Sequence, residues 1–246
     1  MIYPHNSAIG VPLSVAREWM RRALDLLFPP HCVVCSHAGT WFCGACSANV
    51  QVVPEPICIR CGQPVTREGL CSRCRTNPLP LDGIRSAAVF GGSLRTAVHE
   101  FKYHGRRVLA PIFGEMMHQY WTHSGVSVDV VVPVALHPSR KKERGFDQAY
   151  LLAVEFSIRS RLPLDYEHLL RMRSTAPQVS LGFAQRMANV ANAFAWRGSG
   201  LGGRRILLID DVCTTGATLA ACASVLRSAG AGSVWALTLA RPLNGN

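Results

Sequence analysis

One stretch near the C-terminus, residues 205–218, constrains the fold of this chain more than any other. Four aliphatic residues in a row, Ile206 to Ile209, predict a short strand that is buried on both faces, as in a parallel sheet. Two carboxylates, Asp210 and Asp211, follow directly, and an apolar helical run begins at Leu219. This order of strand, polar turn and helix predicts the βα unit of an α/β protein.

The polar turn itself has the residues of a ligand site. In open α/β sheets the ligand lies at the carboxyl ends of the strands. Small hydroxyl residues and a glycine at the start of a helix offer free N–H groups and room for a phosphate, and this turn has Thr214, Thr215 and Gly216. Because carboxylates suit sugar hydroxyls or a metal ion, we expect a site for a phosphorylated sugar. The alternative is an ordinary polar turn after a buried strand.

A second group of charges follows the apolar run 129–134, which predicts another buried strand. Arg140, Lys141, Lys142 and Arg144 place four cations within five residues. We expect them to form a basic loop at the carboxyl end of a parallel strand, where an anionic ligand binds. A solvated run of charges is the alternative.

The rest of the pattern predicts how the chain is divided. Further strands are expected at 84–90, 168–170, 193–196 and 233–239, and helices at 14–28, 93–102, 107–120, 148–160 and 219–226. The long polar stretch 171–186 is expected to be a lid loop. The Asn-Pro-Leu-Pro-Leu segment at 77–81 separates a lead-in with an amphipathic helix (1–30) and a cysteine-rich module (31–76) from a main domain (81–246).

Eight of the ten cysteines form four Cys-x-x-Cys pairs: Cys32 and Cys35, Cys43 and Cys46, Cys58 and Cys61, Cys71 and Cys74. Two such pairs complete one tetrahedral Zn²⁺ site, so the eight thiols predict two closed, structural Cys₄ sites. Sequence neighbours are the natural partners, but the spacing also allows an interleaved pairing. Disulfides are disfavoured, because the N-terminus lacks the pattern of a secretion signal. Cys213 and Cys222 lie outside the pattern.

The charge balance points to anionic partners. The chain carries 26 Lys and Arg against 15 Asp and Glu, a formal net charge of +11. Such a surplus favours nucleic acid, phosphorylated small molecules or an acidic partner, although a solvated surface is the default interpretation. No run reaches the roughly 20 apolar residues that span a bilayer. We therefore expect a cytoplasmic protein without a transmembrane segment.

The stretch 205–218 resembles the signature with which type I phosphoribosyltransferases bind 5-phosphoribosyl 1-pyrophosphate (PRPP). The whole chain resembles the ComF family of competence-associated, amidophosphoribosyltransferase-like proteins. This wider resemblance covers nearly all of 25–241 and is carried by a double zinc ribbon and by residues 101–105, 133–138, 144–148, 171–186 and 189. It implies a type I phosphoribosyltransferase fold, in which helices cover both faces of a mostly parallel sheet, with a small N-terminal double zinc ribbon. The chain departs from the family pattern at Ala135, where proline is common, and at Asp147, where asparagine is common.

The resemblance also implies a function, which is to bind PRPP with Mg²⁺ and transfer its phosphoribosyl group to an acceptor that the sequence does not identify. Asp210 and Asp211 would be the catalytic residues, and the PRPP-binding set would be Asp210, Asp211, Val212, Cys213, Thr214, Thr215, Gly216, Ala217 and Thr218. The pyrophosphate loop and lid would contribute Lys102, Ala135, Leu136, His137, Arg140, Lys141, Arg144, Arg171 and Arg186. The alternative is an accessory protein of DNA uptake or transformation that binds single-stranded DNA or other competence proteins, with a regulatory or vestigial PRPP site.

Overall fold

The computed structural model of the chain describes residues 29–174, 185, 189–190 and 192–243. The expected helix at 14–28 and most of the expected lid, including Arg186, lie outside the described residues.

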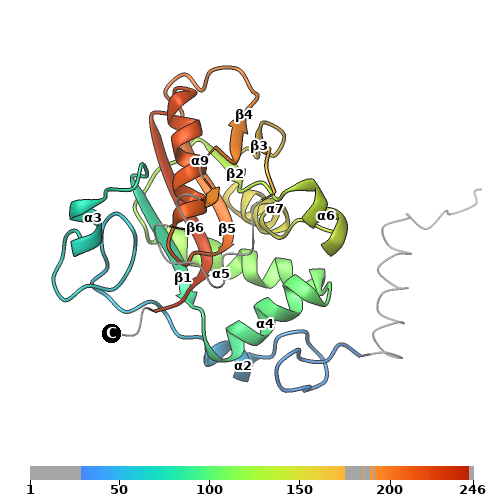
Figure 1. Cartoon of the computed structure of the whole chain (residues 1–246). Helices are drawn as coiled ribbons and strands as arrows, with labels where there is room; N and C mark the ends of the chain where they lie inside the picture. The colour runs from blue at the N-terminus through green and yellow to red at the C-terminus, as the bar shows by residue number, and fades with distance from the viewer. Residues whose placement is uncertain (1–28, 175–184, 186–188, 191, 244–246) are drawn as a thin grey trace, which may run out of the picture.

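A four-stranded parallel sheet forms the centre of the molecule (Figure 1). Its strand order is β1-β6-β5-β2, with bounds Gly83–Val89 (β1), Ser233–Arg241 (β6), Arg205–Val212 (β5) and Val130–Pro133 (β2). All three neighbouring pairs are parallel, with Val131 opposite Leu207 and Ile209 opposite Leu237. The parallel sheet expected from the apolar runs is confirmed.

Helices cover both faces of this sheet because successive side chains of β5 point to opposite sides. Leu207 and Ile209 pack into a core that also contains residues of α4 (Gly92–Tyr103), α5 (Ala110–Thr122) and α7 (Gln148–Ser160). Ile206 and Leu208 pack into a second core with α9 (Ala217–Ser228). All four β5 residues are fully buried, which explains why the run is apolar without alternation.

The remaining elements are short. They are α2 (Gly44–Ala48), α3 (Ser72–Thr76), the 3₁₀ helix η1 (Arg107–Leu109), α6 (Pro138–Arg144), β3 (Leu169–Arg171) and β4 (Phe194–Trp196). Strands β3 and β4 pair antiparallel in a separate small sheet. Within the described part of the chain, no helix has the length and apolar character needed to cross a membrane.

The expectation of a basic loop after β2 is wrong, because these residues form the helix α6. Pro138 begins the helix, where its missing N–H costs nothing, and the His137 ring accepts a hydrogen bond from the Ser139 N–H at 3.3 Å. Gly145, in the left-handed region at φ 75°, ends it. The four cations are therefore held on a rigid element.

The cysteine-rich module packs against both cores of the main domain. Cys43 and Cys46 belong to the core with α4 and α5, and the Ser93 hydroxyl donates to the Cys46 carbonyl at 2.8 Å. Cys58 and Cys61 belong to the core with α9, and the fully buried Arg241 donates from a guanidinium N–H to the Cys61 carbonyl at 2.6 Å. The two halves of the module thus contact opposite faces of the sheet.

Candidate functional site

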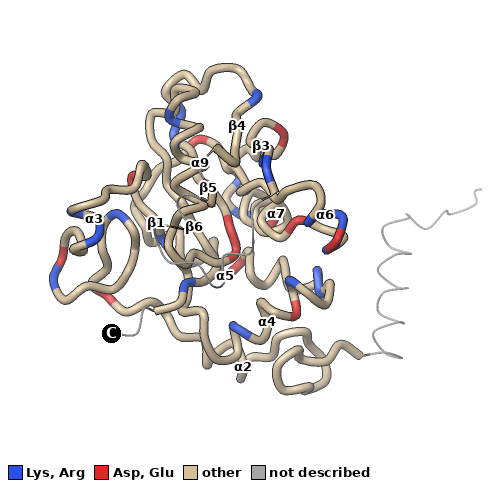
Figure 2. The backbone as a smooth tube through the Cα atoms, in the orientation of Figure 1, with Lys and Arg blue, Asp and Glu red and all other residues tan. Residues whose placement is uncertain are grey.

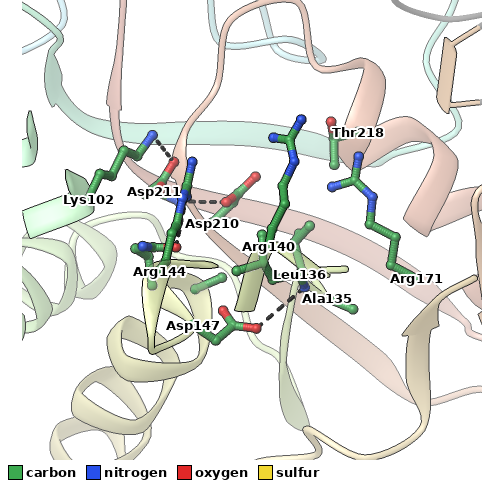
Figure 3. Close-up of a pocket in the computed structure, with 13 residues that line it drawn as sticks. Lys102, Ala135, Leu136, Arg140, Arg144, Asp147, Arg171, Asp210, Asp211 and Thr218 are labelled. Atoms are coloured by element: carbon green, nitrogen blue, oxygen red, sulfur yellow. Dashed lines mark hydrogen bonds and ion pairs between the residues drawn. The ribbon is translucent and has the colours of Figure 1, made fainter. Parts of the chain in front are cut away.

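A cavity of about 190 Å³ lies at the carboxyl ends of β2 and β5, where the sequence predicted a ligand site (Figure 3). Its lining brings together residues from α4, α6, β3, β5 and the start of α9. The predicted residues that line it are Lys102, Ala135, Leu136, Arg140, Arg144, Arg171, Asp210, Asp211 and Thr218. Lys102 and Thr218 are 116 positions apart in the sequence, and the fold brings both to the same cavity.

Asp210 and Asp211 lie near the carboxyl end of strand β5, because this strand continues through Val212 instead of ending at Ile209. Lys102 Nζ contacts Asp211 Oδ1 at 2.8 Å, and the Asp211 N–H donates to Asp210 Oδ1 at 2.8 Å. Burial, and next the neighbouring Asp211 charge, raise the pKa of Asp210 to about 7. Near neutral pH the Asp210 carboxyl is therefore partly protonated, and a cation bound there would displace this proton.

The turn that follows β5 is shaped by Gly216. This residue caps α9 with φ 80°, in the left-handed region that favours glycine. A Cβ there would lie 3.0 Å from Ile84 Cδ1 and 3.3 Å from Leu79 Cδ1. The Thr215 hydroxyl accepts from the Ala217 N–H at 3.3 Å, which tightens the turn. Gly216 and this hydrogen bond thus give the turn a compact form.

Only Thr218 of the residues from 212 to 218 lines the cavity. Cys213 is buried, its N–H donates to the Ala240 carbonyl at 3.0 Å, and burial raises the pKa of its thiol to about 11. The Cys213 side chain therefore belongs to the core on the α9 side of the sheet. Its predicted contact with PRPP can involve only the backbone.

The predicted cations are divided between two cavities. Arg140 and Arg144, one helical turn apart on α6, face the first cavity, whereas His137 and Lys141 line a neighbouring cavity of about 540 Å³. Arg171 lines both cavities, and burial together with the charge of Arg140 lowers the pKa of its guanidinium. The first cavity thus brings Arg140, Arg144 and Arg171 close to the carboxylates Asp210 and Asp211.

Two polar residues of this cavity are absent from the predicted set. Asp147 Oδ1 accepts from the Tyr150 N–H at 3.1 Å and Oδ2 from the Leu136 N–H at 3.4 Å, so this carboxylate caps α7 and holds the segment after β2. Burial raises the pKa of Asp147. Gln148 is buried beside it and accepts from Arg144 at 3.0 Å. Both residues belong to the Gly-Phe-Asp-Gln segment at 145–148, which was the signal that could have identified them.

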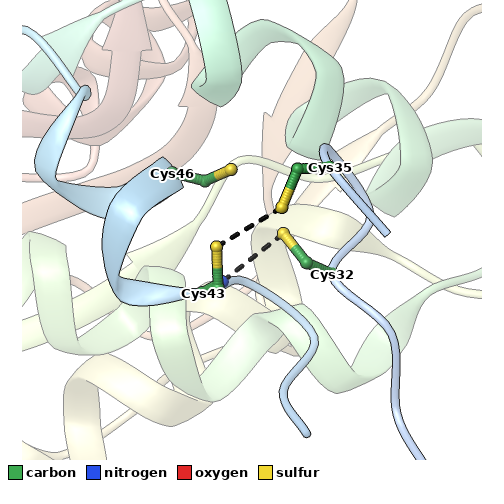
Figure 4. A group of neighbouring side chains, drawn as sticks. All are labelled: Cys32, Cys35, Cys43 and Cys46. Atoms are coloured by element: carbon green, nitrogen blue, oxygen red, sulfur yellow. Dashed lines mark hydrogen bonds between the residues drawn. The ribbon is translucent and has the colours of Figure 1, made fainter. Parts of the chain in front are cut away.

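The eight paired cysteines form two clusters, and the chain has two Cys₄ zinc sites. Figure 4 shows the first cluster, formed by Cys32, Cys35, Cys43 and Cys46. Sulfur atoms around a tetrahedral Zn²⁺ at about 2.3 Å lie about 3.8 Å from one another. The sulfurs of Cys35 and Cys43 are 3.5 Å apart, those of Cys61 and Cys71 are 3.7 Å apart, and each set of four fits within 4.8 Å. The clusters combine the first four and the last four cysteines, which decides the open pairing in favour of sequence neighbours.

Comparisons with known proteins agree with this organisation. Residues 23–75 match the double zinc ribbon domain. The chain is 32% identical to DNA utilization protein YhgH of Escherichia coli over 83% of its length and 92% of that protein. It is 30% identical to competence protein ComFC of Bacillus subtilis over 89% of its length and 88% of that protein.

Solved structures resemble it more distantly. The glutamine PRPP amidotransferase of B. subtilis is 22% identical with a TM-score of 0.39, over 57% of this chain and 30% of the enzyme. The chain has a type I phosphoribosyltransferase fold, with a parallel sheet covered by helices, and it carries a double zinc ribbon.

Proposed function

The chain belongs to the ComF family of competence and DNA-utilization proteins, and from this membership we propose that it binds PRPP with Mg²⁺ and transfers the phosphoribosyl group. One observation carries the proposal. Two adjacent carboxylates, Asp210 and Asp211, share one cavity with Thr218 at the start of α9 and with the cations of α6 and β3. Sugar hydroxyls, a phosphate and a pyrophosphate each have a matching group there.

The carboxylates provide the sugar end of the site. Asp210 and Asp211 would accept hydrogen bonds from the ribose 2′- and 3′-hydroxyls. Lys102, which contacts Asp211 at 2.8 Å, holds this carboxylate in place. Mg²⁺ would bind through carboxylate and substrate oxygens and would neutralise the pyrophosphate. The turn before α9 would receive the 5′-phosphate with N–H and hydroxyl donors.

The basic side of the cavity provides the leaving-group end. Breaking the bond from C1′ to the pyrophosphate leaves positive charge on the sugar and adds negative charge to the leaving group. Arg140, Arg144 and Arg171 are placed to stabilise the latter, and a preorganised electrostatic contribution of this kind is usually the largest in such reactions. The acceptor must then attack C1′ from the opposite face, so the fold contributes mainly position and charge.

The proposal is tested by calorimetry with PRPP and Mg²⁺. We expect the double variant Asp210→Asn, Asp211→Asn to bind PRPP at least about tenfold more weakly than the wild type, which is about 1.4 kcal/mol. Equal affinity would remove the carboxylates from the proposal. A screen for pyrophosphate release with nucleobases and amines then identifies the acceptor, and release with none of them would restrict the function to binding.

Binding of single-stranded DNA is the second candidate function. It is favoured by the net charge of +11 and by the names of the relatives that concern DNA utilization and competence. Figure 2 shows Lys and Arg spread over α3, α4, α6 and the β3–β4 region rather than gathered along one track. Contacts between Lys or Arg side chains and DNA phosphates release counterions, so the affinity for single-stranded DNA should fall steeply as the salt concentration rises. A salt-independent affinity would contradict this function.

The cellular setting is part of the same proposal. Tetrathiolate zinc sites require reduced cysteines, which the cytoplasm maintains. We therefore place the protein in the cytoplasm, where PRPP and single-stranded DNA that has entered the cell would both be available to it. Other competence proteins are the expected protein partners.

A further inference from the structure

Gln148 has a buried amide nitrogen that the site described so far does not use. The residue is 2% exposed, begins α7 and lines the cavity. Its Oε1 accepts a hydrogen bond from Arg144 at 3.0 Å. Its Nε2 has no partner among the residues that the structure describes. Buried donors are almost always bonded in native proteins, so an unpartnered one on a residue that lines a cavity marks a place for a ligand atom.

The contact with Arg144 decides which end of the amide is open. A guanidinium carries only donors, so it must face the amide oxygen. Turning the amide over would set two donors against each other and leave the oxygen without its partner. Arg144 itself is held by the ring of Tyr103, which its guanidinium covers at 5.3 Å. The amide N–H groups are therefore fixed in orientation before any ligand arrives.

We propose that the Gln148 amide donates a hydrogen bond to a phosphate oxygen of the pyrophosphate group. An N–H group needs an acceptor, and the cavity side around Gln148 carries Arg140 and Arg144, which select an anionic one. The two cations of α6 supply charge, whereas Gln148 supplies a neutral donor with a fixed direction. This assignment rests on the proposed PRPP site and adds to it a residue that recognises the leaving group.

A consequence follows for ligand choice. PRPP and inorganic pyrophosphate both carry the oxygen that Gln148 would bind, whereas ribose 5-phosphate does not. Removing the donor should therefore weaken the first two ligands and leave the third unchanged. A purely structural role of Gln148 would change all three affinities together, or would lower the stability of the free protein.

The test is calorimetry of the full-length, zinc-loaded protein with Mg²⁺ and each ligand. Gln148→Met keeps the length of the side chain and removes the donor. We expect its affinity for PRPP and for pyrophosphate to fall roughly tenfold, the usual effect of a hydrogen bond to a charged group. The affinity of Gln148→Glu for both ligands should fall further, because this variant sets a carboxylate against the anion. Gln119→Met on α5, an exposed glutamine bonded to Glu115 at 2.8 Å, is the matched control and should bind as the wild type does.

The outcomes separate the two proposals. A wild-type protein that binds neither PRPP nor pyrophosphate would refute the proposed function itself. A wild type that binds PRPP, together with Gln148→Met of equal affinity, would overturn the Gln148 assignment alone. An equal loss for ribose 5-phosphate would indicate a structural role of Gln148 and would also overturn the assignment. If Gln148→Met does not fold, as judged by its melting temperature and zinc content, a Gln148→Glu protein with undiminished affinity for PRPP would overturn the assignment.

Discussion

At the scale of single residues, the site depends on charges that the fold holds in unfavourable states. Asp210 lies half-buried beside Asp211, and its pKa is raised to about 7. Such a carboxylate is kept because a ligand or cation can use it, since the free protein would be more stable without it. This conflict between binding and stability can be measured.

Asp210→Asn is expected to stabilise the free protein above pH 7. In the unfolded chain this carboxyl titrates at about 4, so between pH 4 and 7 the folded protein holds a proton that the unfolded chain releases. The stability of the wild type therefore falls as the pH rises through this range, and the variant avoids that loss. Urea unfolding should show the variant gaining roughly 2–3 kcal/mol over the wild type between pH 5 and pH 8.

Asp129→Asn is a control, because the contribution of Asp129 to stability should depend on pH in the opposite direction. The Arg205 guanidinium, at 2.6 Å, lowers the pKa of Asp129 to about 2. Its stabilising effect is therefore present above the usual carboxyl pKa of about 4 and disappears as the pH falls from there through the folded pKa of about 2. This variant should lose stability at pH 7. If the difference in unfolding free energy between Asp210→Asn and the wild type does not change between pH 5 and pH 8, Asp210 is ionised in the folded protein throughout this range.

Gly216→Ala is expected to destabilise the chain and weaken PRPP binding. The left-handed conformation costs a residue with a Cβ about 1–2 kcal/mol, and here the Cβ would also crowd Ile84 at 3.0 Å. Gly105→Ala is the matched control, because Gly105 has φ 66° but no atom near its missing Cβ. Thermal unfolding should show a larger loss for Gly216→Ala. Equal losses would mean that the contact with Ile84 contributes nothing.

The residue scale also shows what the sequence could and could not predict. Asp210, Asp211 and Thr218 follow from a local pattern, because strand, turn and helix fix their positions within a few residues. The open nitrogen of Gln148 is a tertiary property that depends on Arg144 and on burial, and no local pattern contains it. Likewise, Ser93 resembles a helix cap in sequence, but its hydroxyl donates to Cys46, which lies 47 positions away.

At the scale of elements, α6 is the part where the sequence interpretation was wrong. Its charge run suggested a loop, whereas Pro138 at the start and Gly145 at the end are ordinary helix signals. The error matters for function. A loop would spread its four cations in all directions, but a helix places Arg140 and Arg144 on one face and Lys142 elsewhere.

This helical arrangement predicts an unequal effect of charge removal along α6. Arg140→Gln and Arg144→Gln should each weaken PRPP binding about tenfold, the effect of one charged hydrogen bond. Lys142→Gln, on the same helix but outside the cavity lining, should bind PRPP normally. Titration of the three variants at one salt concentration checks this. A similar loss in all three would indicate a diffuse charge effect and not direct contacts.

At the scale of the whole molecule, the zinc ribbon and the sheet form shared cores. The first cysteine cluster packs with α4 and α5, and the second packs with Leu79, Ile84 and Cys213 on the α9 side. Leu79 and Ile84 are also the residues against which Gly216 is packed. The second zinc site therefore supports the turn that is proposed to bind the 5′-phosphate, whereas the first lies against the opposite face of the sheet.

This arrangement predicts that loss of either zinc ion has a different consequence. Cys46→Ser and Cys74→Ser should each reduce the metal content from two zinc ions per chain to one, measured by atomic absorption. Both should lower the melting temperature, because a structural zinc site contributes folding energy directly. Cys74→Ser should also weaken PRPP binding more than Cys46→Ser does, since its cluster shares a core with Cys213 and Ile84. If Cys46→Ser proves the more damaging to PRPP affinity, the first cluster acts on the cavity through α4, which carries Lys102 at 2.8 Å from Asp211, and the second only stabilises the edge of the sheet.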